Sequence, residues 1–154
     1  MARTYTQDGP IARALELVGE RWTLLLLQEL LKGVRRFSDL IVSVEGISPN
    51  VLSSRLKTLE ECDVIEQRTY SVHPPRGEYF LTRKGHELGV VAGALAVWGA
   101  RHTNSDIELV HTGCGNSIDV IYHCEGCKIH VPRSEVKLDK VGSFKKCLRP
   151  ITNI

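Results

Sequence analysis

The 154-residue sequence predicts a mainly α fold with a small β-hairpin, a combination that belongs to the α+β class. Apolar residues recur at helical spacing through most of residues 10–102. One short helix in this region has a marked start, because Ser48 and Pro49 suit an N-cap and a first helical position. Between residues 65 and 81, two strand-like runs flank a turn rich in proline.

The helices are identified by their apolar spacing and by their ends. Residues 1–10 form an arm, and Pro10 suits the start of the first helix. Gly19 can end that helix. The leucine-rich run after Trp22 is apolar almost all round, so we expect the second helix to be the most buried. The predicted helices cover residues 10–19, 21–31, 37–42, 48–62 and 83–102.

The order of these elements predicts a winged helix-turn-helix, in which the fourth helix enters a DNA major groove and the hairpin forms the wing. The strands are predicted at residues 65–72 and 78–81. The long final helix follows Thr82, a suitable N-cap. Its apolar residues step by three and four along one face; they are Leu88, Val91, Leu95 and Trp98.

The sequence changes character after this helix, at Asn104-Ser105-Asp106. Residues 107–138 are β-like and contain cysteine, and the residues from 139 onward resemble a tail. We therefore expect a DNA-binding and dimerisation domain over residues 1–104 and a small β-rich appendage over residues 105–154. No internal repeat is evident in the sequence.

Charge and hydropathy narrow the class of protein. The net charge is only +2, but residues 46–59 and 67–77 carry basic side chains and no acid, which suits a phosphate backbone, although ordinary surface scatter gives similar patterns. The N-terminus lacks the apolar run of a signal peptide. The longest apolar stretch, residues 88–100, is too short to span a bilayer. We expect a cytoplasmic protein with no membrane partner and reduced cysteines.

On an ideal helix, Leu52, Leu56 and Leu59 fall on one side and polar residues fall on the other. Asparagine pairs with adenine, serine reaches bases or phosphates, and lysine suits phosphate. Arg55 lies nearer the leucine face, so its role is ambiguous. A plain amphipathic surface helix would show the same pattern. The predicted contacts with double-stranded DNA, from this helix, the start of the third helix and the hairpin tip, are Arg35, Arg36, Ser38, Ser48, Asn50, Ser53, Ser54, Arg55, Lys57, His73 and Arg76.

Three segments carry a family resemblance: PIARALELVGERWTLLLLQELLKGVRRFSDL, GISPNVLSSRLKTLEE and YSVHPPRGEYFLTRKG. Together they resemble the HxlR family of bacterial winged-helix transcription regulators, relatives of the MarR group, over about residues 9–102. The resemblance implies a homodimer that pairs through its N-terminal and long C-terminal helices. Many members have a cysteine before the Pro-Ile-Ala-Arg segment, and in several it senses oxidants. Gly9 stands there in this sequence, which excludes thiol sensing at that site. Cys62 is then a packing residue.

The appendage contains a spaced set of metal-ligand residue types. His111, Cys114, Cys124 and Cys127 resemble the two turns of a small zinc ribbon, and three thiolates with one imidazole can hold Zn²⁺ tetrahedrally. An appendage of this size benefits from a metal when it folds. The alternatives are a metal-free hairpin and a redox-active Cys124–Cys127 pair. Rival fourth ligands are His123, His130 and Cys147.

The sequence therefore predicts a DNA-binding transcription regulator that is not an enzyme. A metal-dependent enzyme built on the appendage is the first alternative, but four ligands would fill the metal's coordination shell, and no paired carboxylates or nucleophile arrangement is evident. A winged helix that binds another protein is the second alternative. The operator sequence, the direction of regulation and the effector are not encoded in any recognisable pattern.

Overall fold

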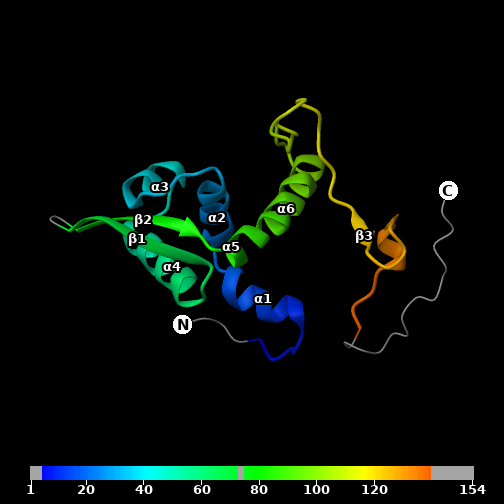
Figure 1. Cartoon of the computed structure of the whole chain (residues 1–154), viewed down its shortest axis with the longest axis horizontal. Helices are drawn as coiled ribbons and strands as arrows, with labels where there is room; N and C mark the ends of the chain where they lie inside the picture. Colours follow the sequence, from blue (N-terminus) through cyan, green and yellow to red (C-terminus); the bar gives the residue numbers. More distant parts are fainter. Residues whose placement is uncertain (1–4, 73–74, 140–154) are drawn as a thin grey trace. The chain divides into compact units, whose positions relative to one another are not determined.

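The computed structural model describes residues 5–72 and 75–139, and it divides into two compact units, Met1–Ala96 and Val97–Ile154. The boundary lies inside a helix, earlier in the chain than the change of composition near residue 104. The first unit has the helices and the hairpin of a winged helix-turn-helix, and this confirms the α+β class (Figure 1). Its elements are α1 (Pro10–Val18), α2 (Thr23–Leu31), α3 (Phe37–Ser43), α4 (Pro49–Glu61), β1 (Ile65–Val72), β2 (Pro75–Leu81) and α5 (Arg83–Glu87).

One core joins α2, α3, α4 and the start of β1. In α2, Leu26, Leu27 and Leu30 are buried, as the apolar run predicts. The same helix leaves Leu25 about half exposed, so it is not buried all round. The other buried members of this core are Val18, Leu40, Val44, Ile47, Leu52, Leu56, Leu59, Val64 and Ile65.

The predicted start of α4 is confirmed. Ser48 is the N-cap, and its hydroxyl accepts a hydrogen bond from the backbone N–H of Val51 at 3.4 Å. Pro49 occupies the first helical position, where its missing N–H removes no intrahelical bond. Because Leu52, Leu56 and Leu59 are all buried, the opposite face of α4 is fixed toward solvent.

The hairpin pairs β1 with β2 in antiparallel register, from Ile65 opposite Leu81 to Val72 opposite Pro75. The register shifts between Thr69 and Ser71. A short segment before α3 adds to the other edge of β2, where the N–H of Tyr79 donates to the carbonyl of Arg35 at 2.8 Å. This bond ties the wing to the start of α3.

The long final helix differs from the prediction, because the structure divides it into α5 and α6 (Gly89–His102). Thr82 caps α5 as expected, since its hydroxyl accepts from the N–H of Gly85 at 3.1 Å. The N–H of Leu88 then bonds to the carbonyl of Gly85 at 3.1 Å, a tightened last turn that ends the helix. Gly85 also lies so close to the carbonyl of Val64 that a Cβ would stand 2.1 Å from that oxygen.

Helix α6 is rich in apolar residues, and none of its residues is buried. Val91, Leu95 and Trp98 are 43%, 50% and 60% exposed. In α1, Ile11 is 63% exposed as well. Within residues 5–72 and 75–139, no helix is both long and apolar enough to cross a membrane.

The second unit consists of short elements. β3 (Tyr122–Cys124) pairs with β4 (Ile129–Val131) in an antiparallel hairpin, and a 3₁₀ turn, η1, covers Arg133–Glu135. Arg101, in the last turn of α6, forms an ion pair of 2.7 Å with Asp119. This unit is β-containing, as the sequence predicts, but much of it has no regular structure.

Candidate nucleic-acid interface

Helix α4 presents short polar and basic side chains to solvent. Asn50, Ser53, Ser54 and Lys57 are all exposed, which agrees with the helical angles predicted for them. Lys57 also lies 3.8 Å from the carboxylate of Glu61, one turn further along. A row of small polar residues on a helix that projects from a packed core can approach base edges closely.

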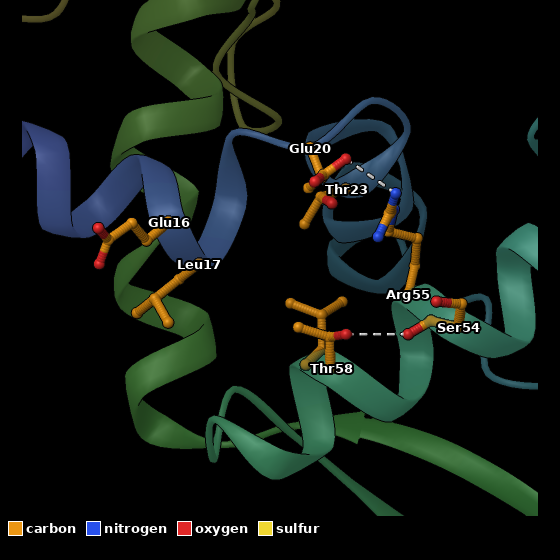
Figure 2. A pocket seen from close by; sticks show the side chains of 8 residues that line it. Glu16, Leu17, Glu20, Thr23, Ser54, Arg55 and Thr58 are labelled. Carbon is orange, nitrogen blue, oxygen red and sulfur yellow. Dashed lines mark hydrogen bonds and ion pairs between the residues drawn. The ribbon is translucent and has the colours of Figure 1, made fainter. Parts of the chain in front are cut away.

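Arg55 turns away from this exposed face. Its side chain is 22% exposed, and Nη2 lies 2.9 Å from Oε2 of Glu20, while Nε donates to the backbone carbonyl of Arg21 at 3.3 Å. Figure 2 shows the guanidinium directed toward the segment between α1 and α2. The structure therefore gives Arg55 a role in holding α4 against the start of α2.

Arg55 also forms part of the wall of a cavity of about 340 Å³ (Figure 2). The hydroxyl of Thr23 is buried and has no hydrogen-bond partner among the described residues. Thr58 donates to the backbone carbonyl of Ser54 at 3.0 Å on the opposite wall. The lining residues are Glu16, Leu17, Glu20, Thr23, Ser54, Arg55, Thr58 and Leu59.

The start of α3 adds cations next to the wing. Arg36 is the N-cap residue of α3, and its Nε lies 3.0 Å from Oε1 of Glu78 on β2. Ser38 is exposed in the first turn and donates to the carboxylate of Asp39 at 3.0 Å. The predicted contacts Arg36 and Ser38 are thus at the surface, Arg36 on the segment that pairs with β2 and Ser38 in the first turn of α3.

The base of the wing contains an arrangement that the sequence does not predict. The guanidinium carbon of Arg35 lies 4.2 Å from the ring centroid of Phe80, and that of Arg68 lies 4.5 Å from the same centroid. Arg68 is exposed on β1 and pairs with Glu66. Phe80 therefore gathers two cations from segments far apart in the chain, and Arg68 joins the candidate contacts.

The tip of the wing is only partly described. Arg76 belongs to β2, where its backbone is opposite Ser71. His73 lies outside the described residues. The predictions for these two side chains therefore stay predictions.

Three of the exposed basic candidates have an acidic neighbour in the free protein: Arg36 with Glu78, Lys57 with Glu61 and Arg68 with Glu66. Each of these pairs is at least half exposed on its basic side. Exposed pairs contribute about 0–1 kcal/mol, so a phosphate can replace the carboxylate at little cost. The ion pairs therefore do not prevent these cations from meeting a nucleic-acid backbone.

The predicted metal ligands form two separate pairs. Nδ1 of His111 lies 3.2 Å from Sγ of Cys114. Cys124 and Cys127 contact each other in the second pair, and hydrogen bonds from Cys127 and from the N–H of Gly126 lower the pKa of Cys124. Across the part of the chain that the structure describes, no three His, Cys, Asp or Glu side chains are grouped closely enough to hold a metal.

Cys62 lies apart from both pairs. It is the C-cap residue of α4, half-buried, and it packs against the core of the first unit. Its place agrees with the predicted packing role. Gly9 stands where the family resemblance implies a sensing cysteine. It is the N-cap residue of α1 and makes no side-chain cap. Cys147 lies outside the described residues.

Comparison with known proteins gives the same picture as the geometry. A family model described as HxlR-like helix-turn-helix matches residues 17–107. An uncharacterized HTH-type transcriptional regulator of Mycobacterium tuberculosis H37Rv is 40% identical over 139 residues, which span 88% of this chain and 87% of that protein. The uncharacterized HTH-type transcriptional regulator YtfH of Escherichia coli K12 is 35% identical over 94 residues, 61% of this chain and 75% of YtfH.

Solved structures extend the similarity beyond the first unit. The candidate transcription factor PA1374 from Pseudomonas aeruginosa has a TM-score of 0.68 and 32% sequence identity. The match covers 90% of this chain and 96% of that chain. A second solved structure, the redox regulator HypR in its reduced form, has a TM-score of 0.57 and 26% identity over 60% of this chain and 92% of that one.

Proposed function

Because this chain belongs to the HxlR-like helix-turn-helix family and is a DNA-binding transcription regulator, not an enzyme, we propose that it binds DNA as a homodimer, with α4 in the major groove and the β1–β2 hairpin as wing. The observation that carries this assignment is the exposed face of α4. Asn50, Ser53, Ser54 and Lys57 face solvent there, on a helix whose opposite face is fully buried.

The contacts divide by chemistry. Asn50 and Ser54 have side chains that hydrogen-bond to base edges, so we assign them to sequence recognition. Lys57, Arg36 and Arg68 carry charges without base-specific geometry here, so we assign them to phosphate. Ser38, Ser48 and Ser53 are exposed at the edges of the same surface and suit phosphate or sugar. Arg76 at the wing is assigned to the backbone or the minor groove.

The homodimer is supported by apolar surface that the chain leaves exposed. Of the four residues that the sequence pattern predicts on one apolar face, Leu88 caps the end of α5, and the other three lie on α6. Val91, Leu95 and Trp98 are between 43% and 60% exposed and form the apolar stripe of α6. Apolar side chains grouped on one helix favour association. A second copy of the same helix covers such a stripe symmetrically, as closed two-fold dimers do.

The place of action follows from the ligand. A regulator that binds chromosomal DNA acts where that DNA is, so we propose a cytoplasmic location. The five cysteines would then be kept reduced.

Selection of bound duplexes from a random pool tests the proposal directly. We expect a pseudo-palindromic site with half-sites roughly one or two helical turns apart. Sedimentation at about micromolar concentration should give a dimer, whose symmetry matches that of the site. An enriched site without two-fold symmetry would count against the dimer alone. If the selection enriched no sequence, the result would favour a winged helix that binds another protein.

A further inference from the structure

The appendage contains two turns with the same backbone structure. In the first, the N–H of Gly115 donates to the carbonyl of His111 at 2.8 Å. In the second, the N–H of Lys128 donates to the carbonyl of Cys124 at 2.7 Å. Strand pairing closes each turn, and it begins at the residue just before the first position of the turn. Val110 pairs with Ser117 around the first turn, and His123 pairs with His130 around the second.

The residue after the fourth position of each turn has a left-handed backbone. Gly115 has a φ of 73° and Lys128 has a φ of 57°. Glycine adopts this conformation readily, but lysine does so at a cost, so the second turn holds its shape against the local preference of its sequence. The same number of residues separates each position of the first turn from the corresponding position of the second, including Gly113 from Gly126.

The metal-ligand residue types occupy the same two positions in both turns. The first position is His111 or Cys124, and the fourth position is Cys114 or Cys127. The two side chains of each turn already lie together, with Nδ1 of His111 at 3.2 Å from Sγ of Cys114 and Cys124 hydrogen-bonded to Cys127. Each turn is therefore a preformed two-ligand site.

The third position is glycine in both turns, and the side chain of the first ligand residue lies next to the place where a Cβ would be. A Cβ on Gly113 would stand 3.0 Å from the imidazole of His111, and a Cβ on Gly126 would stand 3.9 Å from Sγ of Cys124. In the second turn, the N–H groups of Gly126 and Cys127 point at that sulfur. Sulfur that accepts backbone hydrogen bonds in this way is held in place for a metal.

We propose that the two turns together bind one Zn²⁺ ion through His111, Cys114, Cys124 and Cys127. Three thiolates and one imidazole satisfy the tetrahedral preference of zinc and leave no open position, so the site is structural. The correspondence of the turns also selects the fourth ligand. His123 and His130 occupy the flanking positions that Val110 and Ser117 occupy in the first hairpin, and their rings contact each other at 5.6 Å.

Zinc binding would have to bring the two turns together, because no three ligands are grouped in the described residues. Residues 118–121 connect the turns without helix or strand. Ile118, Val120 and Ile121 in this connection are 38%, 40% and 56% exposed. Closing the site would bury part of this apolar surface, so metal binding and folding of the unit support each other.

The test is metal analysis of the full-length protein purified without chelator, followed by replacement with Co²⁺. We expect about one zinc per chain, and a cobalt spectrum with sulfur charge-transfer bands in tetrahedral geometry. His111→Ala and Cys124→Ser should lose the metal or bind it at least tenfold more weakly. His123→Ala and His130→Ala are the matched controls and should retain it. His111→Cys should retain a tetrahedral site with a stronger sulfur band, which separates ligand loss from misfolding.

Three results would overturn the assignment. One is protein that contains no zinc and takes up no Co²⁺. Another is metal that survives both His111→Ala and Cys124→Ser but is lost in Cys147→Ser, which would place the site elsewhere. The last is a wild-type protein that titrates two thiols fewer than its cysteine content, while Cys124→Ser titrates all of its cysteines. That result would indicate a Cys124–Cys127 disulfide. None of these readouts depends on DNA binding, so the zinc proposal and the homodimer proposal fail separately.

Discussion

Single residues of α4 divide the recognition of DNA between bases and backbone. Replacing Asn50 with Ala removes an amide that can pair with adenine, so binding to the selected site should weaken by about 1–3 kcal/mol, and the sequence preference should relax at one position. Affinity for the site and for point-substituted duplexes, measured by fluorescence anisotropy, gives both values. Ser53→Ala is the matched control on the flank of the same helix and should have the smaller effect on preference.

Lys57 should behave differently from Asn50, because a phosphate contact carries no sequence information. Lys57→Ala should weaken all duplexes alike and reduce the slope of log affinity against log salt by about one unit per bound chain. Titrations at several salt concentrations, on the selected duplex and on a scrambled one, measure this. Equal profiles for the Asn50 and Lys57 variants would contradict the division of roles.

Arg55 should affect stability more than DNA binding. Its half-buried guanidinium pairs with Glu20 and donates to the carbonyl of Arg21, so Arg55→Ala should lower the free energy of unfolding by about 1–2 kcal/mol, between the values for exposed and buried pairs. The salt slope of DNA binding should stay unchanged. Arg83→Ala is the control, since that side chain is 95% exposed and pairs only at 3.6 Å with Glu87. A reduced salt slope for Arg55→Ala would restore Arg55 as a phosphate contact.

Tyr79 makes stability depend on alkaline pH. Burial raises the pKa of Tyr79 above its usual value of 10.0, and Glu60 adds to the shift. The unfolded chain therefore loses this proton first, so stability that is fully present below about pH 10 falls as the pH rises toward the folded pKa. Tyr79→Phe should lose less stability than the wild type between about pH 9 and pH 11 in urea unfolding.

The elements are joined by close backbone contacts, and the clearest is at α5. Gly85→Ala would place a Cβ 2.1 Å from the carbonyl of Val64, so we expect a loss of about 1–3 kcal/mol. Gly99→Ala in α6 is the matched control, because a Cβ there meets nothing within 4 Å. That change should be neutral or stabilising by up to about 1 kcal/mol, since alanine favours a helix. Thermal unfolding followed by circular dichroism compares them; equal losses would contradict the contact.

The elements that the sequence predicts well are those fixed by local signals. The start of α4 depends on Ser48 and Pro49, and the buried face of that helix depends on its leucine spacing. The division between α5 and α6 could not be predicted in this way. The break is the tightened turn in which the N–H of Leu88 bonds to the carbonyl of Gly85, a change of backbone conformation that apolar spacing does not report. Local periodicity continues through Leu88 and therefore indicates one helix.

The candidate site shows the same limit. Exposure of Asn50 and Lys57 follows from helical angles alone, and the structure agrees. The engagement of Arg55 requires Glu20, and the grouping of Arg35 with Arg68 requires Phe80; each partner comes from another element. The ligand spacing of the appendage indicates its two turns in the sequence, but their shared left-handed residues, Gly115 and Lys128, are seen only in the structure.

At the scale of the whole molecule, the proposed dimer makes one exposed side chain decisive. Leu95 is half exposed on the apolar stripe of α6. Leu95→Glu would place a charge in the proposed seam, so the protein should sediment as a monomer at about 10 µM. Affinity for a two-half-site duplex should fall at least tenfold, since the half-sites would no longer be bound as one unit. Ile107→Glu, at a position 80% exposed, is the control and should stay dimeric; a dimeric Leu95→Glu protein would exclude this seam.

The stacking of Arg35 and Arg68 on Phe80 has an energetic consequence for association. Two long side chains that are held by a ring have lost part of their rotational freedom before any partner arrives. A polyanion that reaches this place therefore meets cations whose side chains are already ordered. The wing is therefore preorganised, because part of the side-chain entropy that binding would cost is already lost when the protein folds.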